Sequence, residues 1–231
     1  MKINQKNWGH PVKVKARNET IVKMYRKYFS QSLPEGRQYW TIGGQCADTN
    51  GQIIEGCELY HLLSERIITA DQFHSVEVNK DIYKINSKIK DVRWYHKDFY
   101  QAMVESDNVD NFNPAVINFD SLFMPKNGTE YLGKLLNFLT NIKIANVMVV
   151  ANFILQSRYL SSSNEKAIEL LSGVPSICYA LEKAIELLLG VHSVRYALEN
   201  GWELHKESYT YNGTGGKRTV MGTIILVNRS Q

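Results

Sequence analysis

Glycines and carboxylates follow or end several strand-like segments of this 231-residue chain. Glycine lets a backbone approach a ligand closely, and a carboxylate can accept hydrogen bonds from two neighbouring hydroxyl groups. In an open parallel sheet, ligands bind at the carboxyl ends of the strands. The residues of this kind are Gly43, Gly44, Glu77, Asp98 and Asp120. Together they predict a ligand site at that edge of a sheet.

The elements that would position these residues alternate along the chain between short apolar segments and segments with helical periodicity. The expected strands are residues 39–42, 73–78, 92–95, 114–120, 146–153, 202–211 and 219–227. The expected helices cover residues 18–29, 80–90 and 131–139, and another begins at Glu58. Alternating strand and helix units imply parallel strands joined by right-handed crossovers.

The last two strands differ from the others because only a short turn separates them. Residues 212–217, Asn-Gly-Thr-Gly-Gly-Lys, are a strong hairpin signal. We therefore predict an α/β fold, a doubly wound, mostly parallel seven-stranded sheet with a C-terminal antiparallel hairpin.

Over roughly residues 38–155, the order of these strand ends, with the terminal hairpin, resembles the class I, Rossmann-like, S-adenosylmethionine-dependent methyltransferases. The resemblance implies that the chain is a transferase with S-adenosylmethionine as its cofactor. The cofactor-binding residues that it implies are Gly43, Gly44, Gln45, Glu77, Val78, Asp98 and Phe99, and the catalytic residue is Asp120. The methyl acceptor would be a nucleic acid or a related small molecule.

Each position has an implied role. The glycine turn with Gln45 would approach the methionine half of the cofactor, Glu77 would bind the ribose, and Asp98 and Phe99 would contact the adenine. Asp120 would face the methyl group and position or deprotonate the acceptor. Methyl transfer needs mainly alignment of the acceptor with the sulfonium, so the lack of a histidine or cysteine catalytic motif fits this chemistry.

Two departures from the family pattern leave alternatives open. The family has an acidic residue two positions before the first glycine, where this chain has Thr41. Asp48, Glu55 and Glu58 are the candidates to replace it beside the cofactor's ammonium group. The sequence Asn118-Phe119-Asp120 is not the signature of amino-group methylation on bases, so the acceptor stays open. The alternative function is a non-catalytic Rossmann-like binding protein that has lost methyltransferase activity.

Charge and cysteine content bear on partners and location. The net charge is +4, and basic residues gather near the start of the chain, in and just before the first expected helix, which indicates either a nucleic-acid contact or a solvated helix face. They are Lys13, Lys15, Arg17, Lys23, Arg26 and Lys27. Three cysteines without a C-x-x-C motif predict no metal site, and the lack of a secretory signal or apolar membrane span predicts a cytoplasmic protein.

We expect one methyltransferase-like domain over residues 1–231, with an N-terminal helical extension at 1–37. A tandem duplication with a period of 17 residues repeats Glu165–Leu171 as Glu182–Leu188. Two copies are too few for a solenoid. We therefore predict a duplicated helical insert at residues 161–200. It either covers one face of the sheet, which is the role that we favour, or forms an interaction surface.

Overall fold

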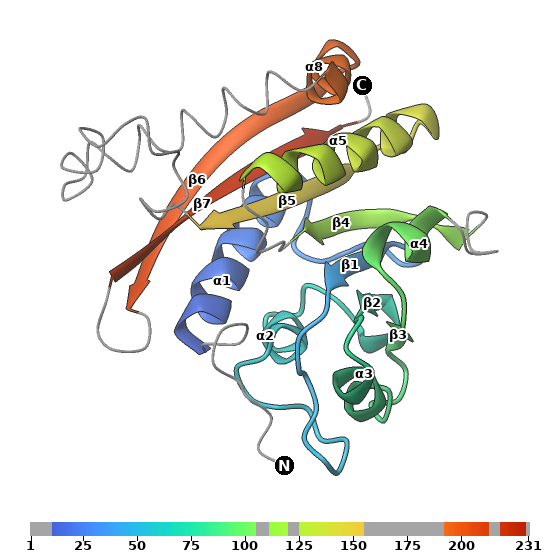
Figure 1. Ribbon diagram of the computed structural model, residues 1–231, viewed down its shortest axis with the longest axis vertical. Coiled ribbons are helices and arrows are strands. Elements are labelled where there is room, and N and C mark those ends of the chain that lie inside the picture. Colours follow the sequence, from blue (N-terminus) through green and yellow to red (C-terminus); the bar gives the residue numbers. More distant parts are fainter. Residues whose placement is uncertain (1–10, 105–110, 120–124, 155–191, 213–217, 230–231) are drawn as a thin grey trace. The chain divides into compact units, whose positions relative to one another are not determined.

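The computed structural model describes residues 11–104, 111–119, 125–154, 192–212 and 218–229 (Figure 1). The strands form a seven-stranded sheet in the order β3-β2-β1-β4-β5-β7-β6. The chain divides into two compact units, residues 1–118 and 119–231.

The first unit carries the parallel part of the sheet. Its elements are α1 (Pro11–Tyr28), β1 (Gln38–Ile42), α2 (Glu58–Ser64), the 3₁₀ helix η1 (Ala70–Gln72), β2 (Phe73–Val76), α3 (Lys80–Asn86), β3 (Arg93–Tyr95), α4 (Phe99–Val104) and β4 (Pro114–Phe119). β1 is an internal strand of this part, because it pairs in parallel with both β2 and β4. β2 also pairs in parallel with β3. The carboxyl ends of these strands therefore lie at one edge.

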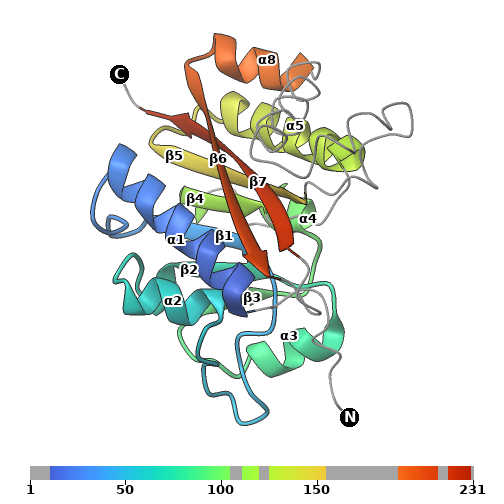
Figure 2. The same cartoon turned by 90° about the vertical axis from the view of Figure 1, so that its left-hand side faces the viewer.

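α1 is amphipathic and packs beside α2 (Figure 2). Ile21, Met24 and Tyr25 are at most 2% exposed, while Lys23 between them is exposed. The helix begins at Pro11, earlier than the expected start at residue 18. Proline suits the first turn of a helix because the missing N–H would have no partner there.

The second unit carries the antiparallel part. Its described elements are α5 (Pro125–Asn141), β5 (Val147–Ile154), α8 (His192–Glu199), β6 (Trp202–Asn212) and β7 (Arg218–Asn228). β7 pairs antiparallel with β5 on one side and with β6 on the other. Residues Val147–Ala151 of β5 are fully buried, as a continuous apolar run predicts. α5 and α8 lie side by side (Figure 2).

The predicted fold class is confirmed, since all seven expected strands form and the last two are antiparallel. The sequence missed α4 and η1, which are shorter than two helical turns and carry too little periodicity to detect. Residues 161–191 of the duplicated insert lie outside the described residues, so its covering role stays a prediction, as does the single domain. No described helix is long and apolar enough to cross a membrane.

Candidate functional site

The turn after β1 lies against the end of β2. The N–H of Gly43 donates a hydrogen bond to the carbonyl of Val76. A Cβ atom on Gly43 would lie 2.6 Å from that carbonyl oxygen and 3.0 Å from Oε2 of Glu77. At Gly44, by contrast, an added Cβ would meet no atom within 4 Å. The first glycine is therefore required by the close approach of two strand ends, and the second faces open space.

Glu77 directly follows β2 and places its carboxylate beside this turn. The residue is only 9% exposed, its N–H donates to the carbonyl of Tyr95 (2.9 Å), and its Oε1 accepts from the N–H of Asn79 (2.6 Å). Burial raises the pKa of the Glu77 carboxyl, and hydrogen bonds from the backbone of Asn79 and Val78 partly oppose this. The site thus holds a partly desolvated acid next to a glycine turn.

The other cofactor-binding residues that were predicted after β2 and β3 differ in their exposure. Val78 is 70% exposed, so it offers an apolar side chain to a ligand. Asp98 is exposed, and its Oδ1 accepts from the N–H of Gln101 (2.9 Å), which caps α4. Phe99 is buried at 9% exposure. Val78 and Asp98 are therefore available at the surface, whereas Phe99 belongs mainly to the packing.

Asn86, at the end of α3, was not predicted and holds the loop that follows the glycines. Its side chain is fully buried, and its Oδ1 accepts from the N–H groups of Cys46 (2.9 Å) and Ala47 (3.1 Å). Its Nδ2 donates to the carbonyl of Gly44 (2.8 Å). Asn86 therefore satisfies three backbone groups of the loop. No motif marks an asparagine at a helix end as such a residue, because its partners are about 40 positions away.

Glu58 is the centre of a buried polar cluster rather than a free ligand-binding acid. It is 8% exposed, and its two carboxylate oxygens accept four hydrogen bonds. The donors are Arg17 Nη2 (2.9 Å), Tyr39 Oη (2.6 Å), Thr41 Oγ1 (3.1 Å) and Asn118 Nδ2 (2.7 Å). A carboxylate has about four lone-pair directions, so these donors fill it. Burial and the Glu58 charge together raise the pKa of Tyr39 well above its ordinary value.

The other two candidates for the missing acid differ. Oδ1 of Asp48 accepts from the N–H groups of Asn50 and Gln52, both at 2.9 Å, so it stabilises its own turn. Glu55 makes no side-chain hydrogen bond within the described part of the chain. Asp120, the predicted catalytic residue, lies outside the described residues, and its role stays a prediction.

The basic helix α1 directs two of its arginines towards the protein. Arg17 pairs with buried Glu58, and Arg26 contacts both the side chain and the carbonyl of Glu65. Lys15 lies 3.8 Å from Glu19 on the helix surface. Nucleic-acid binding through α1 stays a prediction, but Arg17 cannot contribute a phosphate contact without leaving Glu58.

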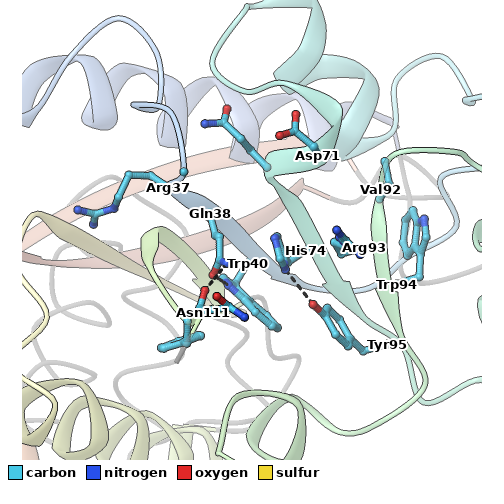
Figure 3. Close-up of a pocket in the computed structure, with 13 residues that line it drawn as sticks. Arg37, Gln38, Trp40, Asp71, His74, Val92, Arg93, Trp94, Tyr95 and Asn111 are labelled. Carbon is cyan, nitrogen blue, oxygen red and sulfur yellow. Dashed lines mark hydrogen bonds between the residues drawn. The ribbon is translucent and has the colours of Figure 1, made fainter. Parts of the chain in front are cut away.

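A cavity of about 740 Å³ lies at the opposite edge, near the amino ends of the parallel strands (Figure 3). Trp40 stacks on Tyr95 at 5.2 Å between ring centroids and makes a tilted ring contact with His74 at 4.8 Å. The Tyr95 hydroxyl lies 3.0 Å from Nδ1 of His74. Burial, with the charge of Arg93, lowers the pKa of His74 to about 4. Since Gly43 and Glu77 follow the carboxyl ends, this cavity is separate from the predicted cofactor site.

His74 predicts a pH dependence of stability. A histidine whose pKa falls from about 6.5 to about 4 on folding stabilises the protein above pH 6.5 and loses this contribution as the pH falls through 4. We expect the free energy of unfolding of the parent, relative to His74→Gln, to fall by roughly 2–3 kcal/mol between pH 7 and pH 4. Urea titrations at several pH values measure this. Arg93→Gln should shrink the fall, and an unchanged difference between parent and His74→Gln would contradict the assignment.

The two glycines provide a matched pair of substitutions. Gly43→Ala should destabilise the fold by about 1–3 kcal/mol, because its Cβ would collide with backbone. Gly44→Ala should change stability by less than about 0.5 kcal/mol, since its Cβ meets nothing. Thermal unfolding of both variants checks the contrast, and equal losses would show that the turn is not packed in this way.

Of the comparisons with known proteins, only the one with solved structures finds similar proteins. No protein-family model and no curated protein sequence matches the chain. The N-methyltransferase NodS from Bradyrhizobium japonicum WM9 is 10% identical with a TM-score of 0.43, covering 96% of this chain and 98% of its own. The methyltransferase domain of bacterial CtHen1-C is 10% identical with a TM-score of 0.47, covering 93% and 97%.

An O-methyltransferase from Bacillus cereus, solved with S-adenosylhomocysteine, is 12% identical with a TM-score of 0.39, covering 97% of this chain and 92% of its own. At such low identity and TM-score, the site has to be interpreted from this chain's own residues. The strand order, with its antiparallel end, agrees with the fold expected from the resemblance to class I methyltransferases.

Proposed function

We propose that this chain binds S-adenosylmethionine at the turn after β1 and transfers its methyl group to an acceptor. The observation that carries the proposal is the Glu77 carboxylate beside Gly43, at the adjacent carboxyl ends of two parallel strands. Ligands of doubly wound sheets bind at this edge, and a carboxylate there can accept from both ribose hydroxyls.

The surrounding residues fit the rest of the cofactor. Gly44 leaves open space for the methionine half, and exposed Val78 offers an apolar surface to the adenine. Asp98 uses Oδ1 to cap α4, and its second oxygen can accept from the adenine amino group. The bound cofactor would supply an activated methyl group, so the protein's own task is to orient the acceptor. We assign that task to Asp120.

Gln45 can supply the acceptor that the missing acid would have provided. Its Nε2 donates to the carbonyl of Ala47 (3.0 Å), while its Oε1 is buried and has no hydrogen-bond partner among the described residues. A buried carbonyl oxygen without a donor is costly unless a ligand satisfies it. The cofactor's ammonium group is such a donor, and Glu58 is already filled by its four partners.

Calorimetry tests the proposal directly. S-adenosylhomocysteine titrated into the purified chain should give a saturable binding isotherm, and NADH titrated in the same way should give none. Transfer of a labelled methyl group is then assayed with bulk RNA, bulk DNA and small-molecule acceptors. The absence of S-adenosylhomocysteine binding would exclude the proposed activity.

A non-catalytic binding protein is the second candidate, and the commitment of Glu58 to internal contacts favours it. In that case the family's acid before the glycines is missing and its nearest buried substitute is unavailable. Cofactor binding together with labelled methyl on any acceptor would exclude this candidate.

A further inference from the structure

Cys46 and Cys57 lie in contact at the two ends of one loop between β1 and α2. Both are free thiols, 4% and 8% exposed. The N–H of Ile54 donates to the carbonyl of Cys46 (2.8 Å), and the N–H of Cys57 donates to the carbonyl of Ile54 (3.2 Å). These two bonds fold the loop back so that Sγ of Cys57 lies 3.7 Å from the carbonyl oxygen of Cys46.

The two sulfurs have different surroundings. Cys57 is the N-cap of α2, and its Sγ accepts from the N–H of Tyr60 (3.3 Å). The neighbouring Cys46 side chain lowers the pKa of the Cys57 thiol, and backbone donors add to this. The same contact, together with burial, raises the pKa of Cys46. The thiolate, which is the reactive form, therefore forms at Cys57, with a second thiol beside it.

We propose that Cys46 and Cys57 are a modification site that forms a reversible disulfide when a peroxide oxidises the chain. The Cys57 thiolate attacks one peroxide oxygen, which forms a sulfenic acid and releases water after protonation. The Cys46 thiol then attacks the Cys57 sulfur, the S–O bond breaks, and a second water leaves. Two thiols and one hydrogen peroxide thus give one disulfide and two waters.

The disulfide would lock the segment that follows the glycine turn. Cys46 comes directly after Gly44 and Gln45, and its N–H is one of the groups held by Asn86. A cross-link between Cys46 and Cys57 closes a loop of about 12 residues, which restricts the unfolded chain more than the folded one. The disulfide does not depend on the proposed function, because neither thiol is assigned to the cofactor.

The test uses the full chain treated with hydrogen peroxide, alkylated, digested and analysed by mass spectrometry. We expect a peptide that contains both Cys46 and Cys57, is lighter than its reduced form by two hydrogen atoms and regains them with dithiothreitol. The oxidised chain should melt on the order of 5–10 °C above the reduced chain. Cys178→Ser is the matched control and should retain both effects. Thiols that stay reduced, a link to Cys178, or sulfinic acid in place of the link would overturn the proposal.

Single variants test the order of attack. In Cys46→Ser, the sulfenic acid at Cys57 has no second thiol and should be trapped by dimedone. Cys57→Ser keeps an N-cap oxygen for α2, so the fold is retained, and Cys46 should not react with dimedone. Dimedone labelling of Cys46 but not Cys57 would overturn the assignment of Cys57 as the attacking sulfur.

Discussion

Glu58→Ala is expected to lower the free energy of unfolding by about 3–5 kcal/mol, the largest loss that we predict for one side chain. The carboxylate accepts four hydrogen bonds, one of them from the buried Arg17 guanidinium at 2.9 Å. Removal of Glu58 takes this carboxylate away from a buried cation whose side chain is 6% exposed. Tyr39 and Asn118 lose acceptors in the same cluster. Urea unfolding of parent and variant measures the loss.

Glu65→Ala is the matched control, since Glu65 also joins α2 to an arginine of α1. The Glu65 and Arg26 side chains are 41% and 34% exposed and lie 3.3 Å apart. A pair in contact with water contributes about 0–1 kcal/mol. The two variants remove the same chemical group from opposite ends of one short helix. If they cost the same, the Glu58 cluster would not be the buried centre described here.

Arg17 provides a second check through a double variant. Arg17→Met with Glu58→Leu replaces the buried pair by apolar groups, and such a replacement often costs much less than the removal of one partner. We expect the double variant to be more stable than Glu58→Ala. If the double variant is less stable than Glu58→Ala, the stability of the cluster depends mainly on the hydrogen bonds of Tyr39, Thr41 and Asn118 and not on Arg17.

The fold was more predictable than the site, and the reason is physical. The strand at residues 147–154 could be predicted, because a strand in a sheet covered on both faces is a continuous apolar run. The contacts of Glu58 and Asn86 could not be predicted, because their hydrogen-bond partners lie 17 to 60 and 39 to 42 positions away, respectively, in the sequence. The chemistry of a buried polar group is decided by these distant donors.

Strand ends fall between these two cases. Glu77 was selected because it lies at the end of the expected strand 73–78, whereas β2 itself ends at Val76. Asn79 ends the extended segment because its side chain accepts from the N–H groups of Asp81 and Ile82 and so caps α3. The same short sequence thus sets where the strand ends and where the carboxylate lies.

Glu77→Gln should weaken the binding of S-adenosylhomocysteine by on the order of 10-fold, and Glu77→Ala by roughly 100- to 10,000-fold. Two charge-assisted hydrogen bonds to the ribose hydroxyls contribute about 1.5–3 kcal/mol each, and glutamine keeps one uncharged acceptor. Calorimetry of both variants measures the affinities. Asp81→Asn, an exposed acid in the next helix, is the control and should bind like the parent.

Glu77→Gln should be more stable than the parent although it binds the ligand less tightly. This combination distinguishes a ligand-binding acid from a structural one. Because burial raises the pKa of Glu77 in the folded chain, its contribution to stability is fully present below pH ~4 and is lost as the pH rises through the raised value. At pH 7 the ionised Glu77 carboxylate therefore lowers the stability of the folded state. We expect Glu77→Gln to melt at a higher temperature than the parent at pH 7, with the difference vanishing in acid. A variant that binds less tightly and is also less stable at pH 7 would identify Glu77 as a structural acid. If the acid serves the ligand instead, its neutral replacement removes the cost of burying a charge and should stabilise the fold.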